Sequence, residues 1–313
     1  MIYNEFRYNH ISGSDGLKLS VLRIEPAGNR SIKGIVQIAH GMCEHKERYV
    51  EFMKYLAEKG YITVINDHRG HGESVKSKND LGYMYEGGYK ALVDDIHEIT
   101  LETKKYAEKE LGLEKIPYIL LGHSMGSMIV RCYIKKYDDE IDRLLVMGCP
   151  VEAKGTKIGL LLLKAIEMIK GDKGHSKMLD YLVMDSRYKK KFESEGPAAW
   201  LSSNPEVWRK VQVDPLCGFH FTVNGYRNLF KLLMWTYSDG EYTMKNPGLK
   251  IKFLSGKDDP CAESKAALGK AMKLIKKQGY KNVSGKMYKG MRHELLNERE
   301  NIRVYKDILE FIG

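Results

Sequence analysis

Short apolar stretches alternate with amphipathic segments along most of this chain. Apolar runs of strand length occupy residues 35–39, 62–66, 118–121, 144–148, 251–255 and 283–287. Between them, apolar side chains recur at the three- and four-residue spacing of helices, in segments 49–56, 92–99, 262–277 and 302–312. Strands and helices in alternation build a mostly parallel sheet with helices on both faces, so we expect an α/β fold of this architecture.

The alternation of strands and helices stops after residue 150 and resumes near residue 247. The intervening segment is irregular and mostly helical, and its most apolar helix carries the run 160–163 with Ile166 and Ile169. We therefore expect two parts. Residues 1–150 and 247–313 form the core, and residues 151–246 form an inserted helical cap.

Aromatic residues gather in the predicted cap, which contains all three tryptophans of the chain: Trp200, Trp208 and Trp235. Phe219 and Phe221 lie between the second and third of them. These rings either fill a small core of the cap itself or line an apolar acyl pocket beneath it. The apolar face at 160–163 is suited to contact a lipid or micelle surface.

A serine stands at a predicted sharp turn between a strand and a helix. The sequence Gly122-His123-Ser124-Met125-Gly126 follows the apolar run 118–121 and precedes the helix-like segment 127–130. Such a turn is strained, and neighbouring backbone comes so close that only small residues fit two positions away on each side. The turn presents the Ser124 hydroxyl to a substrate, so we predict Ser124 as a nucleophile.

A serine nucleophile needs a base within hydrogen-bond reach, and a buried acid must orient that base. Where the serine turn has this form, the acid and then the histidine follow it along the chain, on loops after late strands. His293 is the only histidine after His220, and it lies just beyond the strand predicted at 283–287. We assign it as the general base and then the general acid.

The acid is expected in the loop after the strand at 251–255, where Asp258 and Asp259 are adjacent. We favour Asp259, which Pro260 fixes in place, and keep Asp258 as the fallback. Asp239 is a remoter third candidate because it precedes the strand.

Acyl transfer also needs donors aimed at the developing oxyanion. The backbone N–H of Met125 follows the nucleophile directly, and the N–H of Met42 lies in the loop after an earlier strand. Gly41 lets that loop turn toward the substrate, and His40 either shapes the turn or lines the pocket. The pocket candidates are His40, Gly41, His123, Trp200, Trp208, Phe219 and Trp235.

The composition is that of an ordinary globular protein, with 313 residues of which 43% are hydrophobic and 29% charged. The start of the chain lacks a basic and apolar secretory pattern, and no run approaches the roughly 18 apolar residues of a spanning helix, so we expect a cytoplasmic protein. Five scattered cysteines without a C-x-x-C pair predict free thiols.

Basic residues outnumber acidic ones, 51 to 41, and the net charge is +10. The lysines are dispersed over predicted helix faces, and no helix-turn-helix, aromatic RNA-binding strand or basic arm is present, so no nucleic-acid partner is expected. A solvated surface accounts for the charge, and weak attraction to anionic lipid head groups is the alternative.

Several segments carry a family resemblance. Residues 40–49 resemble the H-G-x-x-E-H-x-x-R-Y segment of monoacylglycerol lipases and bacterial lysophospholipase-like hydrolases, and residues 67–74 are similar to their D-x-R-G-H-G-x-S turn. Residues 256–260 and 292–294 resemble the acid and histidine loops. The resemblance covers most of the chain apart from the cap. It implies the α/β-hydrolase fold with a helical cap, and hydrolysis of carboxylic esters without a cofactor.

The expected activity is ester hydrolysis through an acyl-enzyme, on a small acyl ester or lipid. A peptidase or amidase using the same triad is one alternative, with Glu193, Glu195 or Glu206 as candidates to hold an amine. A non-catalytic binding protein on the same scaffold is another.

Asp67, His68 and His71 are interpreted as a tight structural turn, so no metal site is expected.

Overall fold

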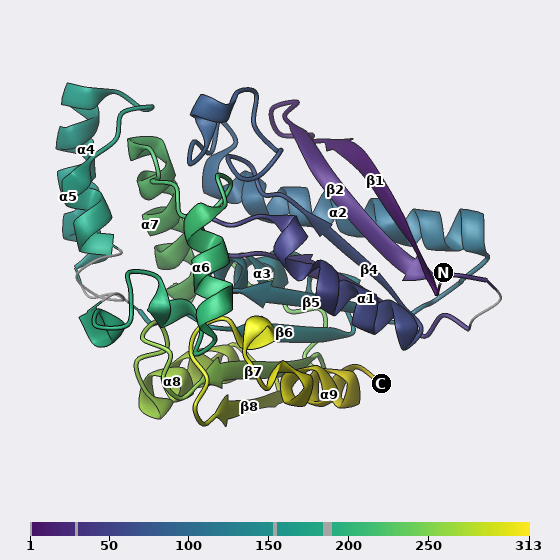
Figure 1. Ribbon diagram of the computed structural model, residues 1–313. Coiled ribbons are helices and arrows are strands. Elements are labelled where there is room, and N and C mark those ends of the chain that lie inside the picture. Colours follow the sequence, from purple (N-terminus) through teal and green to yellow (C-terminus); the bar gives the residue numbers. More distant parts are fainter. Residues whose placement is uncertain (1, 29–30, 153–154, 184–189) are drawn as a thin grey trace.

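The computed structural model describes residues 2–28, 31–152, 155–183 and 190–313. In these residues, strands form one eight-stranded sheet in the order β1-β2-β4-β3-β5-β6-β7-β8 (Figure 1). The strands are β1 (Tyr3–Ile11), β2 (Lys18–Pro26), β3 (Gly34–Ala39), β4 (Tyr61–Asn66), β5 (Tyr118–His123), β6 (Arg143–Met147), β7 (Lys250–Gly256) and β8 (Asn282–Tyr288). The α-helices are α1 (Val50–Glu58), α2 (Gly88–Leu111), α3 (Met125–Tyr137), α4 (Thr156–Lys170), α5 (Lys177–Asp180), α6 (Pro205–Val213), α7 (Val223–Tyr237), α8 (Lys265–Lys277) and α9 (Asn301–Ile312).

The six strands from β3 onward run parallel to one another, and β1 and β2 complete one edge of the sheet in antiparallel pairing. The predicted mostly parallel sheet is therefore confirmed, and its six predicted strands are found within about two residues at either end. Strands β1 and β2 were not predicted from the sequence. Most side chains of β1 are polar and exposed, so this strand lacks the apolar run that marks a buried one.

Consecutive side chains of the central strands enter two different cores. Leu120 and Leu144 pack with α2, α3 and α8, whereas Leu121 and Leu145 pack with α1 and α9. This separation follows from the two-residue period of a strand. Burial on both faces explains why these strands appear in the sequence as uninterrupted apolar runs.

One predicted helix starts later than expected. The sequence suggested residues 262–277, but α8 begins at Lys265, because the Ser264 side chain caps it by accepting a hydrogen bond from the Ala267 N–H. The three preceding residues belong to the turn after β7.

Helices α4 to α7 lie in the chain between β6 and β7, within the segment predicted to interrupt the sheet (Figure 1). Not all of these helices pack in a core that is separate from the core of the sheet. Phe221 and several residues of α7 belong to the same buried cluster as the strand residues, and the Trp235 ring lies 5.8 Å from that of Tyr89 on α2. In contrast, α4 exposes Ile158, Leu161, Met168 and Ile169, each by 72% or more.

All five cysteines are free, as predicted, and the structure buries each of them. Within the described ranges, no helix combines the length and the apolar character needed to cross a bilayer.

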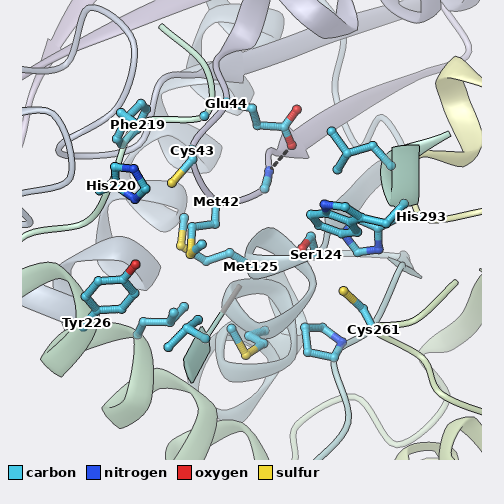
Figure 2. A pocket seen from close by; sticks show the side chains of 18 of the residues that line it. Met42, Cys43, Glu44, Ser124, Met125, Phe219, His220, Tyr226, Cys261 and His293 are labelled. Carbon is cyan, nitrogen blue, oxygen red and sulfur yellow. Dashed lines mark hydrogen bonds between the residues drawn. The ribbon is translucent and has the colours of Figure 1, made fainter. Parts of the chain in front are cut away.

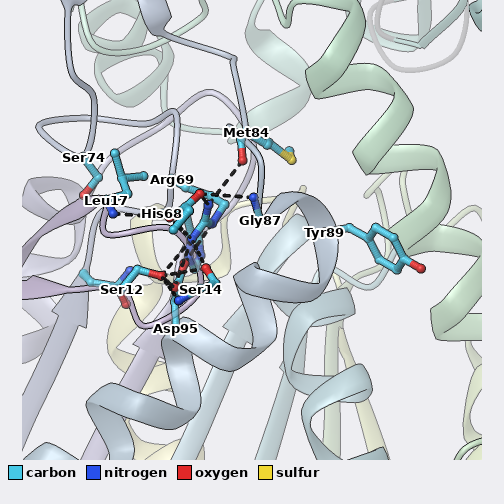
Figure 3. Close-up of polar contacts among 12 residues, drawn as sticks. Ser12, Ser14, Leu17, His68, Arg69, Ser74, Met84, Gly87, Tyr89 and Asp95 are labelled. Carbon is cyan, nitrogen blue, oxygen red and sulfur yellow. Dashed lines mark hydrogen bonds and ion pairs between the residues drawn. The ribbon is translucent and has the colours of Figure 1, made fainter.

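A buried arginine ties the turn after β4 to the N-terminal hairpin and to α2. Arg69 bonds Asp95 through Nε at 3.0 Å and Nη2 at 3.1 Å (Figure 3). Its Nη1 lies 2.7 Å from Asp15 Oδ2. The side chains of Arg69 and Asp95 are exposed by 0% and 2%. One fully buried cation thus joins the turn after β4, the turn of the N-terminal hairpin and α2.

Replacing Arg69 with Met should lower the free energy of unfolding by about 3–5 kcal/mol, because Asp95 and Asp15 then stay buried without a counter-charge. Urea unfolding followed by circular dichroism measures the loss. Adding Asp95→Asn to Arg69→Met removes one unpaired charge and should recover part of the stability. A loss below about 1 kcal/mol would show that solvent already screens this cluster.

Candidate active site

Ser124 occupies the turn between β5 and α3 in a backbone conformation that residues other than glycine rarely adopt. Its φ is +53° and its ψ is −116°. A Cβ at Gly122 would lie 2.3 Å from the Gly126 carbonyl oxygen, and one at Gly126 would lie 2.0 Å from that of Ala39. Both distances are far below van der Waals contact, so the two glycines are required by this close approach.

His293 and Asp259 form a buried pair in the loops that follow β8 and β7. The Nδ1 atom of His293 lies 3.0 Å and 3.1 Å from the two carboxylate oxygens of Asp259. The neighbouring Asp258 is about half exposed and lies near Lys191, and Asp239 bonds Lys277 at the surface. Of the three candidate acids, the structure brings only Asp259 to the histidine.

Burial by itself lowers the pKa of His293, but the charge and hydrogen bond of Asp259 outweigh it and raise the pKa above its ordinary value. The pairing at Nδ1 leaves Nε2 as the nitrogen available for chemistry on the other side of the ring.

Ser124 and His293 line the same cavity, and Figure 2 shows their side chains on one wall of it. Both residues are described, and no hydrogen bond joins their side chains in this conformation. The adjacent residue connects the two loops, because His123 Nε2 lies 3.3 Å from the His293 carbonyl oxygen.

The loop after β3 crosses the cavity beside Ser124. A Cβ at Gly41 would approach the Ser124 Cβ within 3.2 Å, and Met42 and Met125 both line the cavity. The Gly41 N–H donates to Glu44 Oε1 at 2.5 Å, a bond drawn in Figure 2. The backbone next to Met42 is therefore held by a buried carboxylate.

Glu44 belongs to a buried network that the sequence analysis did not identify. Arg48 bonds Glu44 at 2.6 Å and Glu294 at 2.6 and 2.9 Å, and the Tyr49 hydroxyl donates to Glu44 at 2.9 Å. Burial raises the pKa of Glu44, but Arg48 and His123 outweigh it and hold that pKa well below its ordinary value. Residues 40–49 contain three members of this network, so the resemblance pointed to the segment but gave no role for these side chains.

The cavity has a volume of about 690 Å³ and an apolar and a polar region. Glu44, Arg48 and Glu294 line it near Ser124. The apolar lining comes mainly from the segment between β6 and β7, and includes Leu162, Leu179, Leu182, Val183, Leu229 and Leu233.

Four of the predicted pocket residues, Gly41, His123, Trp200 and Phe219, line this cavity, and three do not. His40 is wholly buried, its Nε2 accepts the His68 N–H at 2.9 Å, and so it shapes the turn. Trp208 packs near Gly196, and Trp235 packs on α2 in the main core. Of the two roles expected for His40 the structure shows the turn, and the placements of Trp208 and Trp235 correct the expectation, because tertiary packing and not composition selects which rings face the cavity.

The turn at residues 67–74 is held by carboxylate bonds. Asp67 accepts the Lys46 N–H at 2.8 Å, lies 2.7 Å from Lys46 Nζ and accepts the Glu73 N–H at 2.9 Å. Asp67 is thus already engaged by backbone and lysine groups, as expected of a structural turn.

Known proteins resemble this chain over nearly its whole length. A monoacylglycerol lipase of Mycolicibacterium smegmatis is 24% identical over 281 residues, which cover 90% of this chain and 88% of that protein. A phospholipase of Bacillus subtilis is 22% identical over 272 residues, covering 87% and 92% of the two chains.

Among solved structures, a lipase in an open form superposes with a TM-score of 0.85 at 22% identity, covering 99% of this chain and 98% of its own. A carboxyl esterase from Bacillus coagulans superposes with a TM-score of 0.82 at 23% identity, covering 100% and 98%. A family model described as serine aminopeptidase, S33, matches residues 30–300. The chain therefore has the α/β-hydrolase fold and belongs to the family described as serine aminopeptidase, S33.

Proposed function

We propose that this protein is a serine hydrolase that cleaves carboxylic esters carrying one acyl chain, of the monoacylglycerol and lysophospholipid type. The observation that carries the proposal is the strained Ser124 turn in a cavity that His293 also lines, with Asp259 paired to that histidine. These are a nucleophile, a base and an orienting acid in the chain order typical of the fold.

In the proposed reaction, Ser124 Oγ attacks the ester carbonyl while His293 Nε2 takes its proton. The imidazolium then returns the proton to the leaving alcohol, and an acyl group stays bound to Ser124. Water repeats the sequence and releases the acid. Asp259 holds the Nδ1 side of the ring and stabilises the imidazolium. Serine and imidazole must come within hydrogen-bond reach when substrate binds, as is common where the substrate-free geometry is looser.

The oxyanion is proposed to be held by the backbone N–H groups of Met125 and Met42. Met125 is the first residue of α3, so its N–H has no partner within the helix and the helix dipole favours negative charge there. Met42 follows Gly41, whose own N–H is bonded to Glu44. That bond limits the freedom of the loop and keeps it beside Ser124.

The two regions of the cavity support an amphiphilic substrate. Its apolar walls suit one acyl chain, and the polar side chains of Glu44, Arg48 and Glu294, which also line it, suit a polar alcohol part. The relatives described as monoacylglycerol lipase and phospholipase support the same class.

An aminopeptidase would need a free carboxylate to hold the substrate amine. Glu195 is paired with Arg292 at 2.7 Å, and both Glu44 and Glu294 are paired with Arg48. Glu193 and Glu206 are exposed and do not line the cavity. These pairings favour an ester over a peptide substrate, although the family description names a peptidase. Turnover of amino-acid naphthylamides with no turnover of esters would reverse this choice.

We further propose that residues 151–246 act as a cap over the cavity and that α4 contacts lipid aggregates. Leu163 and Ile166 of α4 are buried, whereas Ile158, Leu161, Met168 and Ile169 are exposed. A helix with one packed face and one exposed apolar face suits shallow insertion at a lipid surface, and the net charge of +10 favours anionic head groups.

Replacing Ser124 with Ala should lower kcat by roughly 10⁴- to 10⁶-fold, because the members of such a triad act as a unit. Hydrolysis of monoacylglycerols and of p-nitrophenyl esters measures the loss, and a fluorophosphonate probe should label the wild-type protein but not the variant. Ser127→Ala, which changes the next serine along α3, should still be labelled. Retention of about a tenth of the rate in Ser124→Ala would exclude Ser124 as the nucleophile.

The pH profile should reflect the raised pKa of His293. Only the neutral imidazole accepts the serine proton, so kcat/KM should fall as the pH drops through a value above the ordinary 6.5. Asp259→Asn removes the group that raises this pKa, so the acid limb should move to lower pH while kcat falls about 10³- to 10⁴-fold. If the acid limb of Asp259→Asn were unchanged, that limb would not reflect the titration of His293.

Replacing Leu161 and Ile169 with Ser should weaken binding to anionic vesicles by about tenfold or more, because each exposed side chain loses its transfer from water. Hydrolysis of a short water-soluble ester should stay unchanged. Ile302→Ser on α9, where the native side chain is 48% exposed, is the matched control and should bind vesicles normally. If the wild type, the double variant and Ile302→Ser bound vesicles equally well, α4 would not be the element that contacts the lipid.

A further inference from the structure

Three metal-ligating side chains of three different kinds meet where the loop after β3 contacts the segment between α6 and α7. The donor atoms of His45, Asp214 and Cys217 all lie within 4.8 Å of one another. We propose that these residues form an exchangeable zinc site that fastens the two segments together. No metal site was expected from the sequence, in which His45 stands at least 169 residues before the other two ligands.

The two ligands on the second segment are held by a local turn. The Cys217 N–H donates to the Asp214 carbonyl oxygen at 3.0 Å, and the Leu216 N–H donates to Asp214 Oδ1 at 2.9 Å. These bonds leave Asp214 Oδ2 directed at His45 Nε2, 2.9 Å away. An Asp-x-x-Cys turn thereby presents a carboxylate oxygen and a sulfur toward one imidazole nitrogen.

The donor set and its dimensions suit zinc. Thiolate, imidazole and carboxylate are its usual ligands, and bond lengths of about 2.0–2.3 Å in a tetrahedron place donor atoms about 3.5 Å apart. The widest separation in the cluster, at most 4.8 Å, therefore has to shrink by up to about 1.3 Å when the ion binds, and the 2.9 Å between His45 Nε2 and Asp214 Oδ2 has to widen by about 0.6 Å. We expect rotation of the three side chains to supply both changes.

The cluster is largely buried but has a route to solvent. The side chains of His45 and Asp214 are exposed by 7% and 31%, and Cys217 is 8% exposed. Three protein ligands leave a fourth position for water, which is typical of an open zinc site and not of a closed structural one. Ion exchange through the Asp214 side is therefore expected.

An ion bound at this cluster would strengthen a contact between two segments of the chain. The Gly218 N–H donates to the Cys43 carbonyl oxygen at 2.9 Å, so the two segments already touch beside the proposed site. Cys43, Cys217 and Gly218 line the cavity, and Met42 lies three residues before His45. A bound ion would strengthen the contact between one wall of the cavity and the loop beside Ser124.

A second cluster in the described residues, Asp259, Cys261 and His293, also has its donor atoms within 4.8 Å. It belongs to the candidate active site, and its members are exposed by only 2–3%. Zinc captured there would block His293. The experiment must therefore distinguish the two clusters.

The test is zinc titration of the purified full-length chain, freed of metal by a chelator, in competition with a chromophoric zinc indicator. One zinc per chain is expected. Cys217→Ala and Asp214→Asn should each weaken binding at least tenfold, whereas Cys261→Ala should bind as the wild type does. Cobalt(II) is the second probe, and its thiolate charge-transfer absorption should vanish in Cys217→Ala and persist in Cys261→Ala.

The variant Asp214→Asn is expected to keep the local fold, because the asparagine oxygen can still accept the hydrogen bond from the Leu216 N–H. A loss of zinc binding in this variant is therefore not the result of misfolding. Zinc should raise the melting temperature of the wild type and of Cys261→Ala, but not that of Asp214→Asn. If stoichiometric zinc binding were lost only in Cys261→Ala, the ion would lie at the cluster of Asp259, Cys261 and His293, and the proposal would be overturned. Absence of stoichiometric binding in the folded wild type would overturn it as well.

Discussion

The site depends on one steric constraint, the close approach of three backbone segments around Ser124. The turn after β5 is so tight that Gly122 faces the Gly126 carbonyl, while Gly126 lies against Ala39 at the end of β3. This contact brings the loop after β3, with Met42, beside the serine. Because parallel strands end at one edge of the sheet, the loops after β7 and β8 bring Asp259 and His293 to the same edge.

Buried charge connects these loops to one another. Arg48 lies between Glu44, which bonds the Gly41 N–H, and Glu294, which follows His293 directly. Removing Arg48 would leave two buried carboxylates without a counter-charge, so the two loops are held in place by the cost of separating either carboxylate from it. The network thereby couples the proposed oxyanion loop to the histidine loop, although neither contacts the other through regular secondary structure.

The segment between β6 and β7 combines two kinds of packing. Helix α7 shares the main core, and its Trp235 packs on α2, whereas α4 buries one face and exposes the other. This arrangement anchors the cavity wall firmly at one end and leaves an apolar helix at the surface. A lipid-facing role for α4 and a metal link at His45, Asp214 and Cys217 would act on different parts of that segment.

The sequence alone determined the alternation of strands and helices, the serine turn and the candidate histidine, because these depend on local periodicity and on glycine spacing. It favoured Asp259 without excluding Asp258, missed β1 and β2, and offered Trp208 and Trp235 as pocket candidates. Only the tertiary structure decided those points, since burial, pairing and the direction of a side chain depend on residues distant in the chain. The same reason explains why the Glu44 network and the His45 cluster became visible only after folding: their members meet across loops that no local pattern relates.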